Sequence, residues 1–338
     1  MANPLATNED AAGYLAEFVH PEQYLFFALV CKGWRNAWEP RRKVTSYLAP
    51  GFSVSQLLHC FECGLPRNNV ALCAAIAYIG NLELLQCARA AGCPWDTSTC
   101  NMAALGGHLD VLRWARANKC PWNVTTCYRA ASKGHLEVLR WARSQGCPWD
   151  EWTSNAAASG GYLDVLKWAR DKGCPWDNFT CTMAAKGGHL EVLQWARRNG
   201  CRWSAYTCKG AASGGHLAVL IWARANGCPW DERTCKGAAT GGHLDILRWA
   251  RDNGCPWDED TCTAAASRGH LDVLVWARAN GCPWDKWTCR RAAEGGHLEC
   301  LRWARENGCP WSEGTCNAAR VGGHARVLQW ARANGCPG

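Results

Sequence analysis

Cysteine and histidine recur along the sequence at spacings that could bind a metal ion or sense oxidation. Cys228 and Cys235 form a Cys-x6-Cys pair, and His243 follows as a possible third ligand. Zinc sites usually use tighter pairs such as Cys-x2-Cys. Ser154 replaces one recurring cysteine without changing the spacing, and Cys300 adds a thiol at one place only. We therefore predict small buried thiols with no metal and no cofactor, and keep a metal-binding or redox-sensing Cys-rich protein as an alternative.

One histidine recurs in each repeat, and Tyr162 takes its position once. Neighbouring members should lie about one helix spacing apart, roughly 8–10 Å, which is too far for two of them to share a metal ion. We predict instead that each one makes a hydrogen bond that braces a turn. The set comprises His108, His135, His189, His216, His243, His270, His297 and His324.

Tryptophan and arginine form two further ladders. The 22 tryptophans include two per repeat, such as Trp249 and Trp257, which we predict to pack in the core. A recurring arginine, Arg251 in the same repeat, could form a basic rail for nucleic acid or another polyanion. Acidic residues such as Asp245 recur in the same helices, and the net charge is only +8. Two interpretations of the arginines therefore stay open, a solvated face and an anionic partner, with nucleic acid the less favoured partner.

No arrangement typical of catalysis is found. No set of nucleophile, base and orienting residue recurs or stands alone, and no glycine-rich phosphate loop follows a strand. No strand pattern is present at all. We therefore expect no catalytic residues and a protein that is not an enzyme.

The elements that position these residues belong to one repeat of 27 residues. Cys-Pro-Trp or a close variant recurs at this spacing from Cys93 to Cys309 and ends the chain at Cys336, without insertions. In the repeat from Asp231 to Trp257, Asp231 can cap a helix that runs to about Thr240. Such regularity means that each repeat contacts its neighbours in the same way.

The second half of the repeat predicts another helix and two left-handed turns. Gly242 occupies a slot that is always glycine, as expected for positive φ. A helix over residues 244–252 follows, and Asn253-Gly254 should end it. Helices this short are not stable alone, so each must be held by stacking.

The repeat resembles the ankyrin repeat. Residues 238–247 read Ala-Ala-Thr-Gly-Gly-His-Leu-Asp-Ile-Leu, similar to the family's A-A-x-x-G-H-x-x-V-V, and Gly254 to Asp258 stand where the family has G-A-D-V-N. The resemblance covers residues 69–338. It implies an all-α fold, a right-handed α-solenoid of stacked helix-turn-helix repeats that binds protein partners.

The sequence departs from that family in its period. Ankyrin repeats have about 33 residues, whereas these have 27. The shortfall lies between Asp258 and Thr261, where the family carries a projecting β-hairpin finger. We therefore expect a finger-less stack that binds through its helices.

Residues 20–35 show a second resemblance. They read His-Pro-Glu-Gln-Tyr-Leu-Phe-Phe-Ala-Leu-Val-Cys-Lys-Gly-Trp-Arg, similar to the later half of an F-box, although the opening of that motif is absent. The resemblance implies docking to the adaptor of a cullin ubiquitin ligase. The alternative is a small helical N-terminal cap over the first repeat. The candidate docking residues are Pro21, Leu25, Leu29, Val30 and Trp34.

Three segments follow from these patterns. Residues 1–45 form the F-box-like segment, 46–68 a half repeat and linker, and 69–338 the array of about ten repeats. No secretory signal and no run of 18 apolar residues is visible. We therefore expect a monomer in the cytoplasm or nucleus, without membrane contact.

A recognition surface is expected where the framework does not dictate the residue. The position before each recurring threonine of the first helix is rich in aromatic residues, which are typical binding anchors. We expect these residues to be exposed, because the position lies near a helix start. The next variable positions lie three and four residues further on. The candidate partner-binding residues are Trp152, Phe179, Tyr206, Arg233, Trp287, Tyr128, Arg129, Met102, Met183, Arg290 and Arg291. These patterns predict a protein-interaction scaffold, which the F-box resemblance would make a ubiquitin-ligase substrate receptor.

Overall fold

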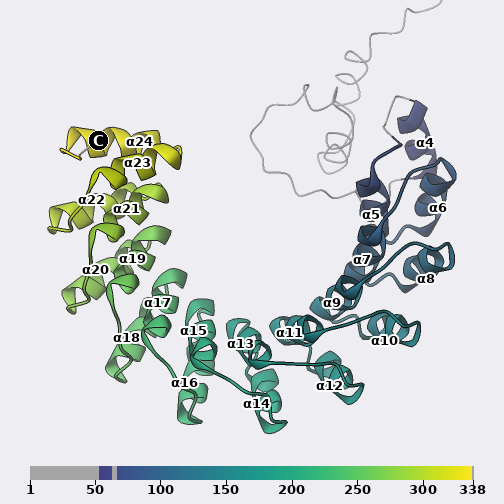
Figure 1. Cartoon of the computed structure of the whole chain (residues 1–338), viewed down its shortest axis with the longest axis horizontal. Helices are drawn as coiled ribbons and strands as arrows, with labels where there is room; N and C mark the ends of the chain where they lie inside the picture. The colour runs from purple at the N-terminus through teal and green to yellow at the C-terminus, as the bar shows by residue number, and fades with distance from the viewer. Residues whose placement is uncertain (1–52, 63–66, 337–338) are drawn as a thin grey trace, which may run out of the picture. The chain divides into compact units, whose positions relative to one another are not determined.

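The computed structural model describes residues 53–62 and 67–336 of the 338-residue chain. All regular elements among these residues are α-helices, with no strand. The chain divides into two units, Met1–Thr153 and Ser154–Gly338. Each unit is a series of two-helix repeats (Figure 1). The described residues therefore confirm the predicted α-solenoid.

Unit 1 holds the first repeats in two layers of helices. Its helices are α4 (Val54–Glu62), α5 (Val70–Ile79), α6 (Leu82–Ala90), α7 (Thr97–Gly106), α8 (Leu109–Ala117), α9 (Val124–Ser132) and α10 (Leu136–Ser144). The first helices pack in series, α5 on α7 and α7 on α9. The second helices follow the same order, and α4 packs on α6 as α6 packs on α8.

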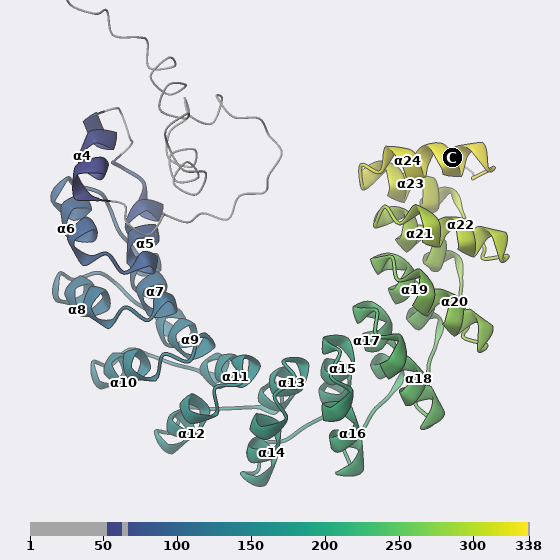
Figure 2. The same cartoon turned by 180° about the vertical axis from the view of Figure 1, so that it is seen from behind.

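Unit 2 repeats this arrangement. Its helices are α11 (Glu151–Gly160), which begins at the end of unit 1, α12 (Leu163–Asp171), α13 (Asn178–Lys186), α14 (Leu190–Arg198), α15 (Ala205–Gly214), α16 (Leu217–Ala225), α17 (Glu232–Gly241), α18 (Leu244–Asp252), α19 (Glu259–Arg268), α20 (Leu271–Ala279), α21 (Lys286–Glu294), α22 (Leu298–Glu306), α23 (Glu313–Val321) and α24 (Ala325–Ala333). From α13 to α23 the odd-numbered helices form one layer, and the even-numbered helices form the other (Figure 2).

The repeat formed by α17 and α18 shows why these boundaries arise. The Asp231 side chain accepts a hydrogen bond of 3.1 Å from the Arg233 backbone N–H and caps α17. Gly242 ends that helix with a φ of 75°, and Gly254 follows α18 with a φ of 80°. Both left-handed glycines were predicted, and α17 ends one residue later than expected, at Gly241.

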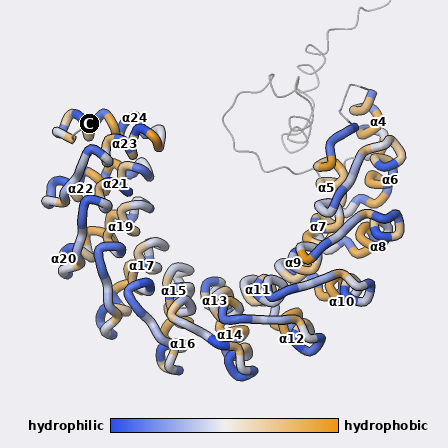
Figure 3. Tube along the Cα trace, viewed as in Figure 1, coloured by the Kyte–Doolittle hydropathy of each residue, from blue (hydrophilic) through white to orange (hydrophobic). Residues whose placement is uncertain are grey.

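Small side chains fill the space between first helices. Cys235, Ala238 and Ala239 of α17 are fully buried, as are Ile246 and Leu247 of α18. The small residues allow close packing of the first layer, while the larger aliphatic residues fill the space between layers. The helices carry both hydrophobic and hydrophilic residues, whereas the connections between repeats are mostly hydrophilic (Figure 3). No helix among the described residues is long and apolar enough to cross a membrane.

Candidate interaction surface

The histidine ladder joins neighbouring repeats. His270 Nε2 lies 3.3 Å from the Thr240 carbonyl oxygen of the preceding repeat, and His108 Nε2 lies 2.9 Å from that of Tyr78. The predicted turn-bracing hydrogen bond is confirmed, but the braced turn belongs to the previous repeat. Burial lowers the pKa of His297, so its neutral form is favoured in the same position. These imidazoles are therefore part of the framework.

The cysteines pair differently from the spacing first considered. Cys235 is hydrogen bonded to Cys255, which lies 20 residues later, whereas Cys228 pairs with Cys208. The structure therefore does not bring Cys228, Cys235 and His243 together as a set of metal ligands. Ser154 stands in the position of one of these cysteines, and its hydroxyl donates a hydrogen bond of 2.8 Å to the Pro175 carbonyl oxygen.

In pairs such as Cys235 and Cys255, the shared hydrogen bond shifts the two thiol pKa values in opposite directions: it lowers the pKa of Cys255 and raises that of Cys235. The hydrogen bond to Cys255, together with burial, raises the pKa of Cys235. Burial raises the pKa of Cys73 to about 12 and that of Cys300 to about 11. Within the described residues, no group of three or more His, Cys, Asp or Glu side chains is arranged to hold a metal ion. The described cysteines other than Cys87 are buried, which confirms that part of the prediction.

The tryptophan and arginine ladders form one interlocked brace. The Arg251 guanidinium stacks over the Trp257 ring, 4.1 Å from its centroid, and donates to the Cys255 carbonyl oxygen. Trp257 in turn makes an edge contact with Trp276 of the next repeat at a centroid distance of 6.0 Å. These tryptophans are half-buried, which corrects the prediction that they belong to the core. The equivalent arginines from Arg116 to Arg305 make the same two contacts within their own chain.

The recurring framework side chains thus make contacts within the array. The variable positions of the first helices are left as the candidates for contact with a partner. The four aromatic candidates in the slot before the threonine are exposed by 51% for Trp152, 43% for Phe179, 42% for Tyr206 and 40% for Trp287. This confirms the exposure expected of that slot. Arg291 is also exposed, and the half-buried candidates are Met102, Tyr128, Arg129, Met183, Arg233 and Arg290.

Tyr206 on α15 is flanked by two cations. Lys209 Nζ lies 5.6 Å from the ring centroid and Arg233 Cζ of the next repeat lies 4.7 Å from it. Arg233 also forms an ion pair of 3.0 Å with Asp231. Lys209, which sequence reasoning missed, occupies the slot three residues after the aromatic one, and the 27-residue frame could have identified it.

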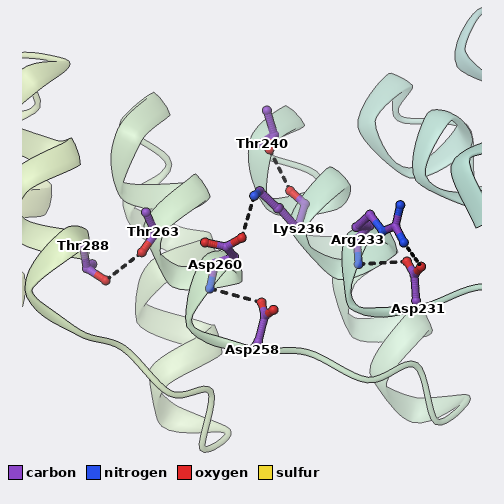
Figure 4. A network of polar contacts seen from close by, with 8 residues as sticks. All are labelled: Asp231, Arg233, Lys236, Thr240, Asp258, Asp260, Thr263 and Thr288. Atoms are coloured by element: carbon purple, nitrogen blue, oxygen red, sulfur yellow. Dashed lines mark hydrogen bonds and ion pairs between the residues drawn. The ribbon is translucent and has the colours of Figure 1, made fainter.

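A groove of about 440 Å³ lies across α17, α19 and α21 and is crossed by an ion pair. Lys236 Nζ lies 2.6 Å from Asp260 Oδ2 of the next repeat (Figure 4). Beyond it, the hydroxyl oxygens of Thr263 and Thr288 are 3.2 Å apart. Lys236 is therefore neutralised within the chain by Asp260.

A second cavity, of about 320 Å³, adjoins Trp287. Arg290 Cζ lies 4.7 Å from the Trp287 ring centroid, and Arg291 forms a 2.6 Å ion pair with Glu294. Within the described part of the chain, the Arg290 Nε is shielded from solvent and has no hydrogen-bond acceptor. The residues that line this cavity are Lys286, Trp287, Arg290, Ser312, Glu313 and Gly314.

The structure thus brings together only some of the predicted residues. On α21, the Trp287 ring lies beside Arg290 and Arg291. Tyr206 contacts Arg233 of the next repeat. In unit 1, Arg129 Cζ lies 5.7 Å from the Tyr128 ring centroid. The five candidate adaptor-docking residues of the F-box-like segment lie outside the described residues.

Comparisons with known proteins add one structural likeness. No family model matches the chain, and no curated protein matches it. Among solved structures, the chain is similar to the ankyrin repeat domain of human ASB11. The two share 16% sequence identity with a TM-score of 0.37, over 46% of this chain and 84% of the other.

Proposed function

We propose that this protein is a protein-interaction scaffold that binds its partner through the exposed side chains of the first helices. The observation that carries the proposal is the series of exposed aromatic residues at a first-helix slot whose residue the framework does not dictate. Exposed aromatic and arginine side chains on rigid elements are typical interface anchors. In this proposal the array positions a partner and carries out no catalysis itself.

The rigidity of the surface supports this role. First helices such as α17 are capped, packed on their neighbours and braced by a histidine from the following repeat. A surface held in this way loses little conformational entropy on binding, which favours affinity. Nucleic acid is a weaker candidate, because the arginine ladder that would bind phosphates is stacked on Trp rings.

Affinity capture with quantitative mass spectrometry tests the proposal. The variant carries Phe179→Ser, Tyr206→Ser and Trp287→Ser together, on first helices of unit 2. The matched control carries Ile221→Ser and Val275→Ser, which remove exposed apolar side chains from second helices of the same unit. We expect specific partners of the wild type to be lost by the variant and kept by the control. Retention of all partners by the variant would contradict the proposal.

The F-box-like resemblance supports a more specific role, that of a substrate receptor for a cullin ubiquitin ligase. Pro21, Leu25, Leu29, Val30 and Trp34 would contact the adaptor, and the repeats would hold the substrate. This role requires the protein to act in the cytoplasm or nucleus. Capture with and without residues 1–45 tests it. Recovery of a cullin adaptor only with the longer chain supports the role, and its absence from both samples opposes it.

A further inference from the structure

We propose that the cavity beside Trp287 is a carboxylate-binding site that anchors an extended acidic segment of the partner protein. This inference rests on the proposed function and names the chemistry of the partner. It follows from a comparison of equivalent positions in neighbouring repeats.

Lys236 and Arg290 occupy the same slot in their repeats, but only Lys236 meets a carboxylate. Asp260, 24 residues after Lys236, lies on the next first helix and forms the 2.6 Å ion pair. Gly314 stands in the position of Asp260 relative to Arg290. Arg290 therefore faces a slot without a side chain where Lys236 faces an acid.

The space left by Gly314 adjoins the guanidinium directly. A Cβ added at Gly314 would lie 3.6 Å from an Arg290 terminal nitrogen and 3.7 Å from its Cδ. The cavity of about 320 Å³ is lined by both residues, and the shielded Arg290 Nε has no acceptor within the described residues. A carboxylate in this space can accept from the Arg290 terminal nitrogen beside Gly314, and guanidinium groups favour such charge-assisted hydrogen bonds.

The surrounding charges and the aromatic wall suit an acidic side chain. Lys286 and Glu313 line the same cavity with opposite charges, and Arg291 is paired with Glu294, so Arg290 leaves the site net positive. The Trp287 ring stacks with Arg290 and offers apolar surface to a residue next to the acid. The chemistry therefore fits Asp or Glu with an apolar neighbour.

A second anchor lies three repeats away at Tyr206 and Lys209. Lys209 occupies the slot of Lys236 and Arg290, and the next repeat offers it Arg233 in place of an acid. With first helices roughly 8–10 Å apart, the two anchors are about 24–30 Å apart. An extended chain advances about 3.3 Å per residue, so two acids separated by about seven to nine residues would reach both sites.

A single-stranded nucleic acid fits this surface less well. Its evenly charged backbone would pass α17 and α19 between the anchors, where Lys236 is already neutralised by Asp260 and Glu259 is exposed. A peptide can place its carboxylates at the anchors alone. Charge complementarity therefore favours the acidic peptide.

Display selection tests the proposal on the full chain. Random 16-residue peptides on phage are selected against the wild-type protein and against the Lys209→Gln, Arg290→Gln double variant. We expect wild-type selections to enrich peptides with two acids about seven to nine residues apart, and the double variant to lose that enrichment. Enrichment of peptides without acids, of the same peptides on both proteins, or of none would overturn the proposal.

Affinity measurements on the best acidic peptide, by fluorescence anisotropy, test the Gly314 slot. Arg290→Gln should weaken binding about tenfold or more. Gly314→Asp should do the same, because it supplies the acid that Asp260 supplies to Lys236. Gly314→Ala and Arg302→Gln, which removes an exposed charge from α22, should change affinity by less than about threefold. Equal affinity of Gly314→Asp and Gly314→Ala would refute the site.

Two further measurements separate the alternatives. Binding of a 20-nucleotide oligothymidylate over a salt series should be weak and insensitive to Arg290→Gln; tighter binding than the peptide would assign the surface to nucleic acid instead. The partners captured by the scaffold are then compared between Arg290→Gln and the triple aromatic variant. Partners lost only from the aromatic variant would leave the scaffold role standing and overturn the acidic site.

Discussion

His270 covers Gly242 across the boundary between two repeats. Its Nε2 meets the carbonyl oxygen that precedes the Gly241-Gly242 turn, and a Cβ added at Gly242 would lie 2.6 Å from the ring. The glycine is therefore required twice, by its φ of 75° and by the imidazole of the next repeat. This contact explains why histidine and glycine recur together in the clear repeats, of which only the one with Tyr162 lacks the histidine.

Substitution of Gly242 by alanine should cost more than substitution of Gly254. Both have similar positive φ values, of 75° and 80°, but nothing lies within 4 Å of a Cβ added at Gly254. Gly254→Ala should therefore lower the free energy of unfolding by about 1 kcal/mol through backbone strain alone. Gly242→Ala should lower it by roughly 2–4 kcal/mol, because the ring must also move. Urea denaturation of both variants measures the difference, and equal losses would argue against the histidine contact.

Lys119 is a natural exception that predicts a stabilising change. It has a φ of 66° and is the only described non-glycine residue with positive φ, in the slot that holds Gly146 and Gly173 in later repeats. Lys119→Gly should raise the free energy of unfolding by about 1 kcal/mol, because the left-handed strain is removed. Thermal denaturation followed by circular dichroism reports the gain. Lys133→Gly is the control, since Lys133 has a φ of −122° and should give no gain.

The arginine that stacks on tryptophan should contribute to stability. Arg251→Gln removes the stacking on Trp257 and the bond to the Cys255 carbonyl oxygen, and should lower the free energy of unfolding by about 1–3 kcal/mol. Arg302→Gln breaks only an exposed 3.7 Å ion pair with Glu299, and should change it by less than about 0.5 kcal/mol. Guanidinium denaturation compares the two. Similar losses of unfolding free energy in the two variants would mean that the Arg251 contacts stabilise the array no more than an exposed ion pair does.

The repeat and its helices could be predicted because their signals are local. Caps such as Asp231 and left-handed glycines such as Gly254 act within a few residues of the chain. The contacts that join repeats could not be assigned from the sequence. Because the same residues recur in every repeat, the sequence does not show whether a side chain contacts its own repeat or a neighbouring one. Cys235 therefore seemed to belong with Cys228 but pairs with Cys255, and the arginine partner of Trp257 was not foreseen.

The candidate surface was predictable in part for the same reason. The slot of Tyr206 and Trp287 stands out because it departs from the repeat, and its exposure follows from its place near a helix start. Gly314 gave no such signal, because a glycine in a variable position has no side chain that would mark the position as a binding site. Its meaning depends on Arg290, 24 residues earlier, and only the folded array places them together.

Cys300 provides a test of how burial controls the thiols. Burial raises its pKa from 9.0 to about 11, so its contribution to stability is complete below pH 9 and is lost as the pH rises toward 11. At pH 10 the loss should be about 1 kcal/mol. Cys300→Val, which places in this slot the residue found at Val273, should match the wild type within about 1 kcal/mol at pH 7. The Cys300→Val variant should lose less stability than the wild type between pH 8 and pH 10.

The reverse substitution in the neighbouring repeat serves as the matched control. Val273 is fully buried in α20, at the position equivalent to Cys300 in α22. Val273→Cys adds one more buried thiol, so its stability should fall more steeply than that of the wild type over the same pH range. Urea denaturation at pH 7, 8, 9 and 10 gives the three slopes. Parallel slopes for Cys300→Val, Val273→Cys and the wild type would show that ionisation of this buried slot does not limit the stability of the array.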